Sequence, residues 1–194
     1  LQPLHGGAPQ RIRAGRRECV FKHALMRDVA YGTILLSRRR QIHLRAAEVM
    51  EEHLGMERSG PDLALLAHHW EQGGAAERAR ERYLAAARFS SGRYAHQEAE
   101  DLYRKYLSLA GEPSVERIGA RMDLAEEVLK IVGQYPQAIQ EHERAREDAL
   151  LLGDRSLEGR TTGALAALHW LVGSVDTARA EAEQAIAMLR EAGD

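Results

Sequence analysis

The chain has 194 residues, enough for one large domain or two small ones with a substantial hydrophobic core. Its 27 basic and 29 acidic residues give a net charge of −2, so bulk charge does not favour binding to nucleic acid. Few aromatic and few β-branched residues argue against an all-β fold. The single cysteine, Cys19, excludes an internal disulfide and fits a reducing cytosol, and no apolar run is long enough to span a membrane. We therefore expect a soluble cytoplasmic chain with no membrane association, and one that is a fragment of a longer protein.

The first 45 residues form a basic N-terminal segment. They contain ten Lys and Arg but only two acidic residues, Glu18 and Asp28, so their net charge is +8 and the rest of the chain carries −10. A weak alternation around Ala14–Gly15 predicts a short β-hairpin with an arginine-rich tip. One helix is expected from about His23 and another after Ser37, which suits an N-cap. The change in charge predicts a structural junction near residue 45.

Glycines recur about every twenty residues from Gly55 onward, and the segments between them are rich in Ala, Leu, Glu and Arg. These four residue types favour helix, and glycine commonly ends a helix in the left-handed conformation. With loops this short, consecutive helices must run antiparallel. The expected helices span residues 38–54, 62–72, 76–91, 94–110, 115–132, 136–152, 156–172 and 175–191.

A period close to 40 residues lies over these helices, because Gly92, Gly133 and Gly173 are 41 and 40 residues apart in the expected turns. Small and aromatic residues follow the turns at matching offsets, where they let two helices approach closely. Ala99 lies two residues beyond its expected offset from Gly92, which predicts an extended turn there. Residues 62–192 therefore resemble tetratricopeptide (TPR) repeats in a long-helix form, with an irregular helical bundle as the alternative. The resemblance implies an all-α fold, a right-handed α-solenoid of TPR-like helical hairpins. The residues expected to pack the repeats are Leu66, Ala67, Trp70, Gly74, Ala79, Tyr83, Ala86, Gly92, Ala99, Tyr103, Gly133, Ala138, Ala145, Gly173, Ala178 and Ala185.

A second resemblance covers residues 19–90. The strings FKHALMRDVAY, QIHLRAAEVMEEHL and LALLAHHWEQGGAAERARERYLAAA are similar to the junction between the winged-helix domain and the TPR sensor region of STAND-type signalling ATPases. That group includes cyclase-linked ATPases and large ATP-binding transcriptional regulators of bacteria. The resemblance implies that residues 1–36 are the C-terminal part of a winged-helix-like segment and that residues 37–194 are a TPR-like repeat domain. It also implies that ATP binds in a module upstream of this chain, which itself has no P-loop and no expected cofactor.

His23 is the one candidate for a nucleotide contact. Winged-helix domains of related ATPases often place a histidine near the bound nucleotide, and His23 occupies the matching position by resemblance. A histidine at the start of a helix also serves commonly as a cap or a packing residue, and that alternative stays open.

Three consecutive arginines, Arg38, Arg39 and Arg40, are candidate interaction residues. If Ser37 is the N-cap, they occupy the first helical turn, where the helix dipole disfavours each cation by about 0.3–1 kcal/mol. Such charges are tolerated when they meet something negative, such as an acidic face of an ATPase module, a nucleotide phosphate or DNA. The alternative is a solvated basic turn. DNA is the least favoured partner, because the acidic remainder of the chain would repel a duplex.

No group of residues suggests catalysis or metal binding. Adjacent side chains such as His68 and His69 point about 100° apart on a helix and cannot share one ion. The carboxylates of the helix at 136–152 alternate with arginines in the pattern of a solvated face; they are Glu141, Glu143, Glu147 and Asp148, beside Arg144 and Arg146. A series of aromatic residues could either pack the core or line a ligand groove: Trp70, Tyr83, Tyr103, Tyr106, Tyr135 and Trp170.

The sequence therefore predicts a non-enzymatic regulatory sensor domain of a multidomain signalling ATPase or transcriptional regulator. It would bind a protein or peptide partner, or hold the neighbouring ATPase module inactive. The alternative is a free-standing TPR scaffold, although three lysines and no asparagine weigh against capture of a peptide carboxylate. Self-association is left open.

Overall fold

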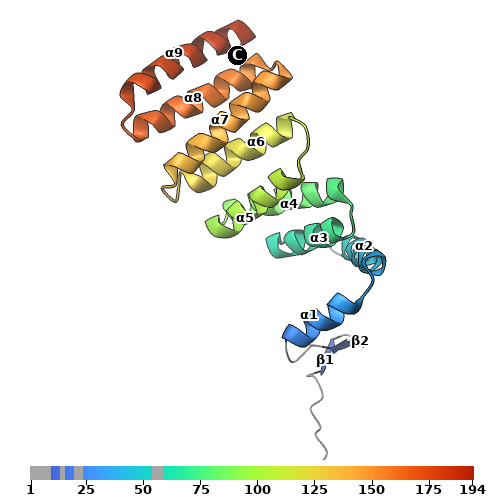
Figure 1. Cartoon of the computed structure of the whole chain (residues 1–194). Helices are drawn as coiled ribbons and strands as arrows, with labels where there is room; N and C mark the ends of the chain where they lie inside the picture. The colour runs from blue at the N-terminus through green and yellow to red at the C-terminus, as the bar shows by residue number, and fades with distance from the viewer. Residues whose placement is uncertain (1–9, 14–15, 20–23, 54–58) are drawn as a thin grey trace, which may run out of the picture.

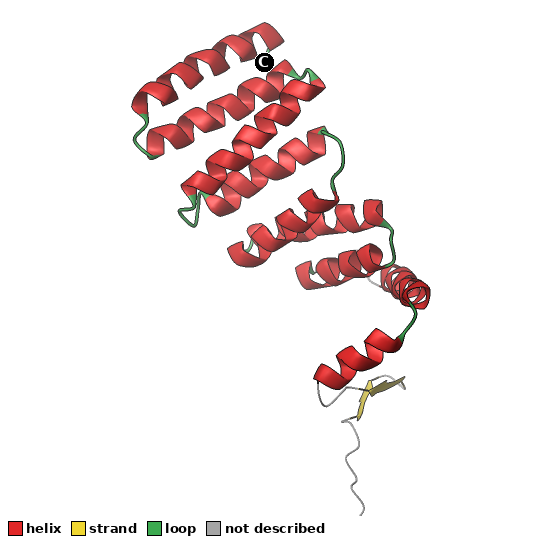
Figure 2. Ribbon diagram, in the orientation of Figure 1, coloured by secondary structure: helices red, strands yellow, loops and turns green. Residues whose placement is uncertain are grey.

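The structure is a computed structural model that describes residues 10–13, 16–19, 24–53 and 59–194, and its body is a row of antiparallel helices (Figures 1 and 2). The basic segment contains the expected hairpin, in which β1 (Gln10–Arg13) pairs with β2 (Arg16–Cys19) so that Gln10 lies opposite Cys19. Its turn at residues 14–15, the candidate His23 and Gly55 all lie outside the described residues.

The helices follow the expected order, and from α2 onward their bounds lie within three residues of those expected from the sequence when α6 is counted together with the π-helical segment that continues it. They are α1 (Ala24–Thr33), α2 (Leu36–His53), α3 (Gly60–Gln72), α4 (Ala76–Ser91), α5 (His96–Leu109), α6 (Val115–Asp123), α7 (Tyr135–Leu152), α8 (Arg155–Leu171) and α9 (Val175–Ala192), and α6 continues into a π-helical segment, η1 (Leu124–Leu129).

The starts of these helices show how the repeats pair. Helices α2, α4, α6 and α8 begin at residues 36, 76, 115 and 155, at intervals of about 40 residues, and α5, α7 and α9 begin at 96, 135 and 175. The repeating units are therefore α4/α5, α6–η1/α7 and α8/α9, with α2/α3 before them. Helix α4 packs against both α3 and α5, so the helices form one continuous stack.

Four turns share one backbone conformation. The residues that precede α4, α5, α7 and α9 have φ between −94° and −83° and ψ between 56° and 68°. One residue earlier, Gly74, Gly133 and Gly173 have a positive φ of 79–84°, which glycine adopts without a steric cost. Tyr94 takes this position before α5, with φ 61°, whereas Gly92 has an ordinary φ of −62°. The turn after α4 thus extends two residues beyond Gly92, as the offset of Ala99 predicts.

The core runs along the stack and consists mainly of alanine and leucine, together with aromatic residues. The alanines four residues after each turn residue, Ala79, Ala99, Ala138 and Ala178, are all buried. The other non-glycine residues expected to pack the repeats are buried too, namely Leu66, Ala67, Trp70, Tyr83, Ala86, Tyr103, Ala145 and Ala185. Small residues allow close helix contacts: a Cβ on Gly159 of α8 would lie 2.9 Å from Leu189 Cγ of α9.

In the described ranges, no helix combines the length and the apolar composition needed to cross a membrane.

Candidate protein-interaction groove

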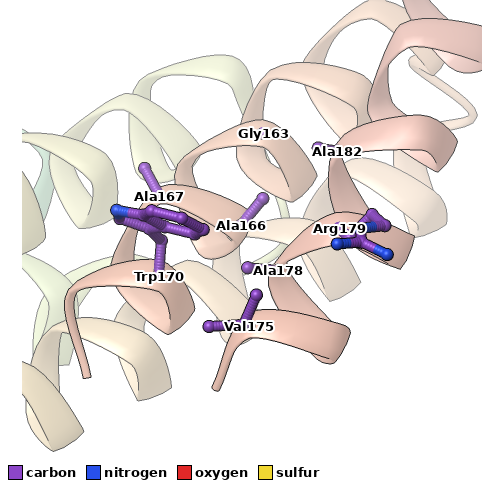
Figure 3. Close-up of a pocket in the computed structure, with 8 residues that line it drawn as sticks. All are labelled: Gly163, Ala166, Ala167, Trp170, Val175, Ala178, Arg179 and Ala182. Carbon is purple, nitrogen blue, oxygen red and sulfur yellow. The ribbon is translucent and has the colours of Figure 1, made fainter. Parts of the chain in front are cut away.

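A groove of about 430 Å³ lies between α8 and α9, close to the turn that joins them (Figure 3). Its lining residues are Gly163, Ala166, Ala167, Trp170, Val175, Ala178, Arg179 and Ala182. Most of these residues are Gly or Ala, whose small side chains form the floor of the groove and leave space above it. Figure 3 shows Trp170 and Arg179 on opposite sides of these small side chains. We call this feature the α8/α9 groove.

Helical spacing produces the α8/α9 groove. Gly163, Ala166 and Trp170 lie three and four residues apart on α8, and Ala178 and Ala182 lie four apart on α9, so each set occupies one helix face. Because the side chains between the helices are small, the space beside the Trp170 ring stays empty. The groove is apolar except for the guanidinium of Arg179.

The two tryptophans of the chain differ in exposure, which bears on the two alternatives for the aromatic residues, core packing and lining a groove. Trp70 is 2% exposed and lies in the core, whereas Trp170 is 64% exposed at the rim of the α8/α9 groove. Tyr83, Tyr103 and Tyr106 are buried, and half-buried Tyr135 packs against the same core. Most of the series therefore packs the core, whereas Trp170 borders a groove.

Two other hollows differ from the α8/α9 groove. One, of about 490 Å³, is lined by Asp101, Arg104, Lys105 and Ser108, all of α5, so a single polar helix face borders it. The other, of about 300 Å³, lies between the start of α3 and the turn after α4. There the guanidinium of Arg93 already covers the Phe89 ring, 4.6 Å from its centroid. Neither offers an exposed aromatic surface of the size of Trp170.

The arginine cluster lies where α1 meets α2. Ser37 is not the N-cap, because α2 begins at Leu36 and the Arg39 N–H already donates to the carbonyl oxygen of Leu35. The Arg39 guanidinium donates to the carbonyl oxygens of Gly32 (3.2 Å) and Ile34 (2.7 Å), at the negative end of the α1 dipole. Arg39 therefore ties two helices of this chain together. Arg38 donates to Gln41 at 3.2 Å, and Arg40 is exposed.

A histidine cluster joins the same end of the molecule. His43 of α2 contacts Tyr31 Oη through Nε2 and His69 Nδ1 through Nδ1, both at 2.8 Å. His68 is exposed, and its ring centroid lies 5.8 Å from that of His43. Burial lowers the pKa of His43 and of His69, and the neighbouring histidines lower both further. The sequence could not reveal this cluster, because His43 is 26 residues from its partner.

The carboxylates of α7 correct one expectation. Glu141 and Asp148 are not on a solvated face; they are 2% and 4% exposed and surround Arg121 of α6. Arg121 contacts Glu141 at 2.6 Å and Asp148 at 3.2 Å, and the rims of this cluster are closed by Arg144 and Arg117. The i, i+3 pair of Glu141 with Arg144 is present at 2.9 Å, but the alternating pattern could not show that α6 covers it.

The described side chains include no group of three His, Cys, Asp or Glu residues that could hold a metal ion. What the site offers chemically is apolar contact area beside one cation, which suits recognition of a side-chain surface.

Comparisons with known proteins support the fold. No protein-family model matches the chain. A similar curated protein is an uncharacterized protein of Rhizobium meliloti (strain 1021), 33% identical over 105 residues, which are 54% of this chain and 10% of that protein. The chain thus spans about a tenth of the length of that relative.

Among solved structures, BtubC (BKLC) from P. vanneervenii superposes with a TM-score of 0.51 at 17% identity, over 88% of this chain and 92% of that one. A kinesin light chain of Podosopora anserina with nearly identical TPR-like repeats gives a TM-score of 0.49 at 16% identity, over 86% and 92%. At these identities the likeness concerns the fold alone. The chain has the fold of a TPR-like helical-repeat protein.

Proposed function

We propose that the chain is a protein-interaction module that recognises its partner at the α8/α9 groove. The observation that carries this proposal is the exposure of Trp170, a large aromatic side chain, above a floor of Gly and Ala. Tryptophan and arginine are the residues that most often dominate binding energy at protein interfaces, and this groove has one of each. A stack of helices supplies a rigid surface for recognition but encloses no site from which water is excluded.

Recovery of partners from an extract of the source organism tests this function. The chain and its Ala182→Glu variant are immobilised side by side, and the bound proteins are identified by mass spectrometry. Ala180→Glu is the matched control, because Ala180 is exposed on α9 outside the groove. We expect a partner bound by the chain and by the control but lost with Ala182→Glu. Identical sets of proteins from all three baits would contradict the assignment of the groove.

We further propose that the module regulates a larger signalling ATPase or transcriptional regulator, with a free-standing scaffold as the second candidate. The ATPase context rests on the sequence resemblance of residues 19–90, and ATP would bind outside this chain. Its test is the coding sequence upstream of Leu1. A P-loop in the same reading frame supports the ATPase context, and a reading frame without one supports the scaffold.

A further inference from the structure

Helix α1 stands apart from the repeat stack, and polar contacts join its last turn to α2 (Figure 1). Its apolar residues Leu25 and Val29 are 75% and 60% exposed, so apolar packing adds little to its position. His43 of α2 contacts Tyr31 Oη, and the Arg39 guanidinium donates to carbonyl oxygens at the end of α1. The position of α1 therefore depends on a small number of hydrogen bonds.

His43 is the central residue of a chain of hydrogen bonds that connects three helices. Its Nε2 contacts Tyr31 Oη of α1, and its Nδ1 contacts His69 Nδ1 of α3, both at 2.8 Å. His43 is 8% exposed, and His69 is half-buried. Both ring nitrogens of His43 are thus engaged, one toward α1 and the other toward the stack.

The contact between the two histidine rings depends on how many protons they carry. A neutral imidazole has one N–H donor and one acceptor nitrogen, so one Nδ1 donates to the other. A first added proton preserves this bond, because an N–H on one ring still faces a lone pair on the other. A second proton places an N–H on both facing nitrogens, which then repel each other. Protonation of both His43 and His69 therefore breaks the chain.

The charged groups around the two rings do not offset such protons. Among the described residues, the charges that act on His43 and His69 are those of neighbouring histidines, and Arg39 adds a cation 5.0 Å from the centroid of the Tyr31 ring. Exposed Arg40 lies one residue further along α2. The carboxylates described on α1, α2 and α3 are exposed or engaged elsewhere: Asp28 and Glu52 are exposed, Glu48 and Glu51 pair with Arg45 and with Arg82 of α4, and Asp62 and Glu71 accept from Ser59 Oγ and Tyr83 Oη.

The connection between α1 and α2 supplies a hinge. Helix α1 ends at Thr33 and α2 begins at Leu36, so residues 34–35 alone join them. The hydrogen bonds from Arg39 reach Gly32 and Ile34, at the hinge itself, and a guanidinium does not titrate near neutral pH. Loss of the contact between Tyr31 and His43 would thus let α1 swing while its end stays tied to α2.

We propose that the Tyr31–His43–His69 chain is a proton-sensitive latch that holds α1 against the stack at neutral pH and releases it in mildly acidic conditions. Burial and the neighbouring histidines lower the pKa of His43 and of His69, so the latched form binds protons less readily than the released form. As the pH falls below 6.5, protons therefore favour release. This inference concerns α1, α2 and α3 and does not depend on the α8/α9 groove.

Distances between spin labels test the latch. Labels are attached to Met26→Cys on α1 and Glu81→Cys on α4, both exposed positions, in a Cys19→Ser background so that only the introduced cysteines react. Pulsed electron spin resonance should give a narrow distance distribution at pH 7.5 and a broad one at pH 5, with a midpoint below pH 6.5. A second label pair at Glu81→Cys and Glu143→Cys, both within the stack, should keep its distance.

Three variants assign the change to the histidine chain. His43→Gln keeps groups that can donate and accept but does not titrate, so its distribution should no longer change with pH. His53→Gln is the matched control, because His53 is exposed near the other end of α2, and it should behave like the unmodified chain. Tyr31→Phe removes the hydroxyl that His43 contacts and should broaden the distribution already at pH 7.5.

The contrary outcomes are equally distinct. A distribution that stays narrow at pH 5 in the unmodified chain would overturn the latch. An unchanged transition in His43→Gln would overturn it too, because the proton would then act at another group. Equal broadening of the second label pair would also overturn it, since it would indicate acid unfolding of the stack in place of release of α1.

Discussion

The α4/α5 and α8/α9 hairpins are built on the same turn, yet they differ in what lies above them. In the first, Tyr103 fills the space between the helices and α6 with η1 closes it. In the second, Ala182 leaves that space empty and Trp170 stands exposed at its edge. The same turn therefore supports a filled and covered groove in one hairpin and an open groove in the other, with Tyr103 and Ala182 at equivalent positions, eight residues after the residue that precedes each helix.

The largest expected effect on stability comes from exchanging large and small side chains at two positions, residue 103 in the α4/α5 hairpin and residue 182 in the α8/α9 hairpin. Tyr103→Ala should empty the filled groove and lower the free energy of unfolding by about 3–5 kcal/mol, since a large buried side chain leaves a cavity. Ala182→Tyr should change it by less than about 0.5 kcal/mol, because the open groove has room for the ring. Urea unfolding followed by circular dichroism measures both. A loss of about 1–3 kcal/mol for Ala182→Tyr, typical of overpacking, would show that the two grooves do not differ.

The buried ionic cluster tests how firmly the middle of the stack is held. Arg121→Ala leaves the carboxylates of Glu141 and Asp148 buried without their central cation, and we expect a loss of about 3 kcal/mol. The control is Arg45→Ala, which breaks an exposed i, i+3 pair with Glu48 and should cost less than about 0.5 kcal/mol. Similar losses for both variants in urea would contradict the burial of this cluster.

The turn before α5 departs from the glycine turns, and this departure predicts a gain in stability. Tyr94 holds a positive φ at a position where the equivalent residues are glycines, so Tyr94→Gly should stabilise the fold by about 0.5–1 kcal/mol. Gly133→Ala should have the opposite sign, by about 1 kcal/mol. Thermal unfolding of the two variants measures both effects, and a destabilised Tyr94→Gly would mean that the tyrosine ring contributes more than its backbone costs.

The smallest and most local effect is expected at the histidine cluster. The pKa values of His43 and His69 are lowered by burial, so both accept protons more readily when the chain is unfolded. Their contribution to stability is therefore present above pH 6.5 and is lost as the pH falls below it. Hydrogen exchange at the α1–α2 junction should accelerate between pH 7.5 and pH 5.5, after correction for the intrinsic rate.

A pair of histidine variants provides the control for this pH dependence. His43→Gln should flatten the pH dependence, and His53→Gln should preserve it, because His53 is exposed and its Nδ1–H donates to the carbonyl oxygen of Val49 in its own helix. An unchanged pH dependence in His43→Gln would remove the cluster from the explanation.

Local patterns were sufficient to predict most of the fold. Glycine spacing and helix-forming composition predict the helices, and the offset between Gly92 and Ala99 predicts the longer turn that Tyr94 completes. Features that depend on a covering helix could not be predicted in the same way. Glu141 and Asp148 look solvated in sequence because the arginine that buries them is on another helix.

From the sequence, the groove at Trp170 was predictable only as one of two alternatives for the aromatic residues, the other being core packing. Trp170 occurs in the same series as Trp70, and nothing in the local sequence of either shows which one has a helix above it. For Arg38–Arg40 the sequence left two alternatives open, a negative partner and a solvated basic turn. Arg39 donates to two carbonyl oxygens at the end of α1, whereas Arg40 is exposed.

Acrylamide quenching of tryptophan fluorescence tests the openness of the α8/α9 groove most directly. At a dilution where light scattering shows a monomer, we expect one accessible and one shielded component, because Trp170 is 64% and Trp70 2% exposed. Trp170→Phe should abolish the accessible component and leave the shielded one. A monomer in which both tryptophans are shielded would contradict the account, since the groove would then already be covered by the chain itself.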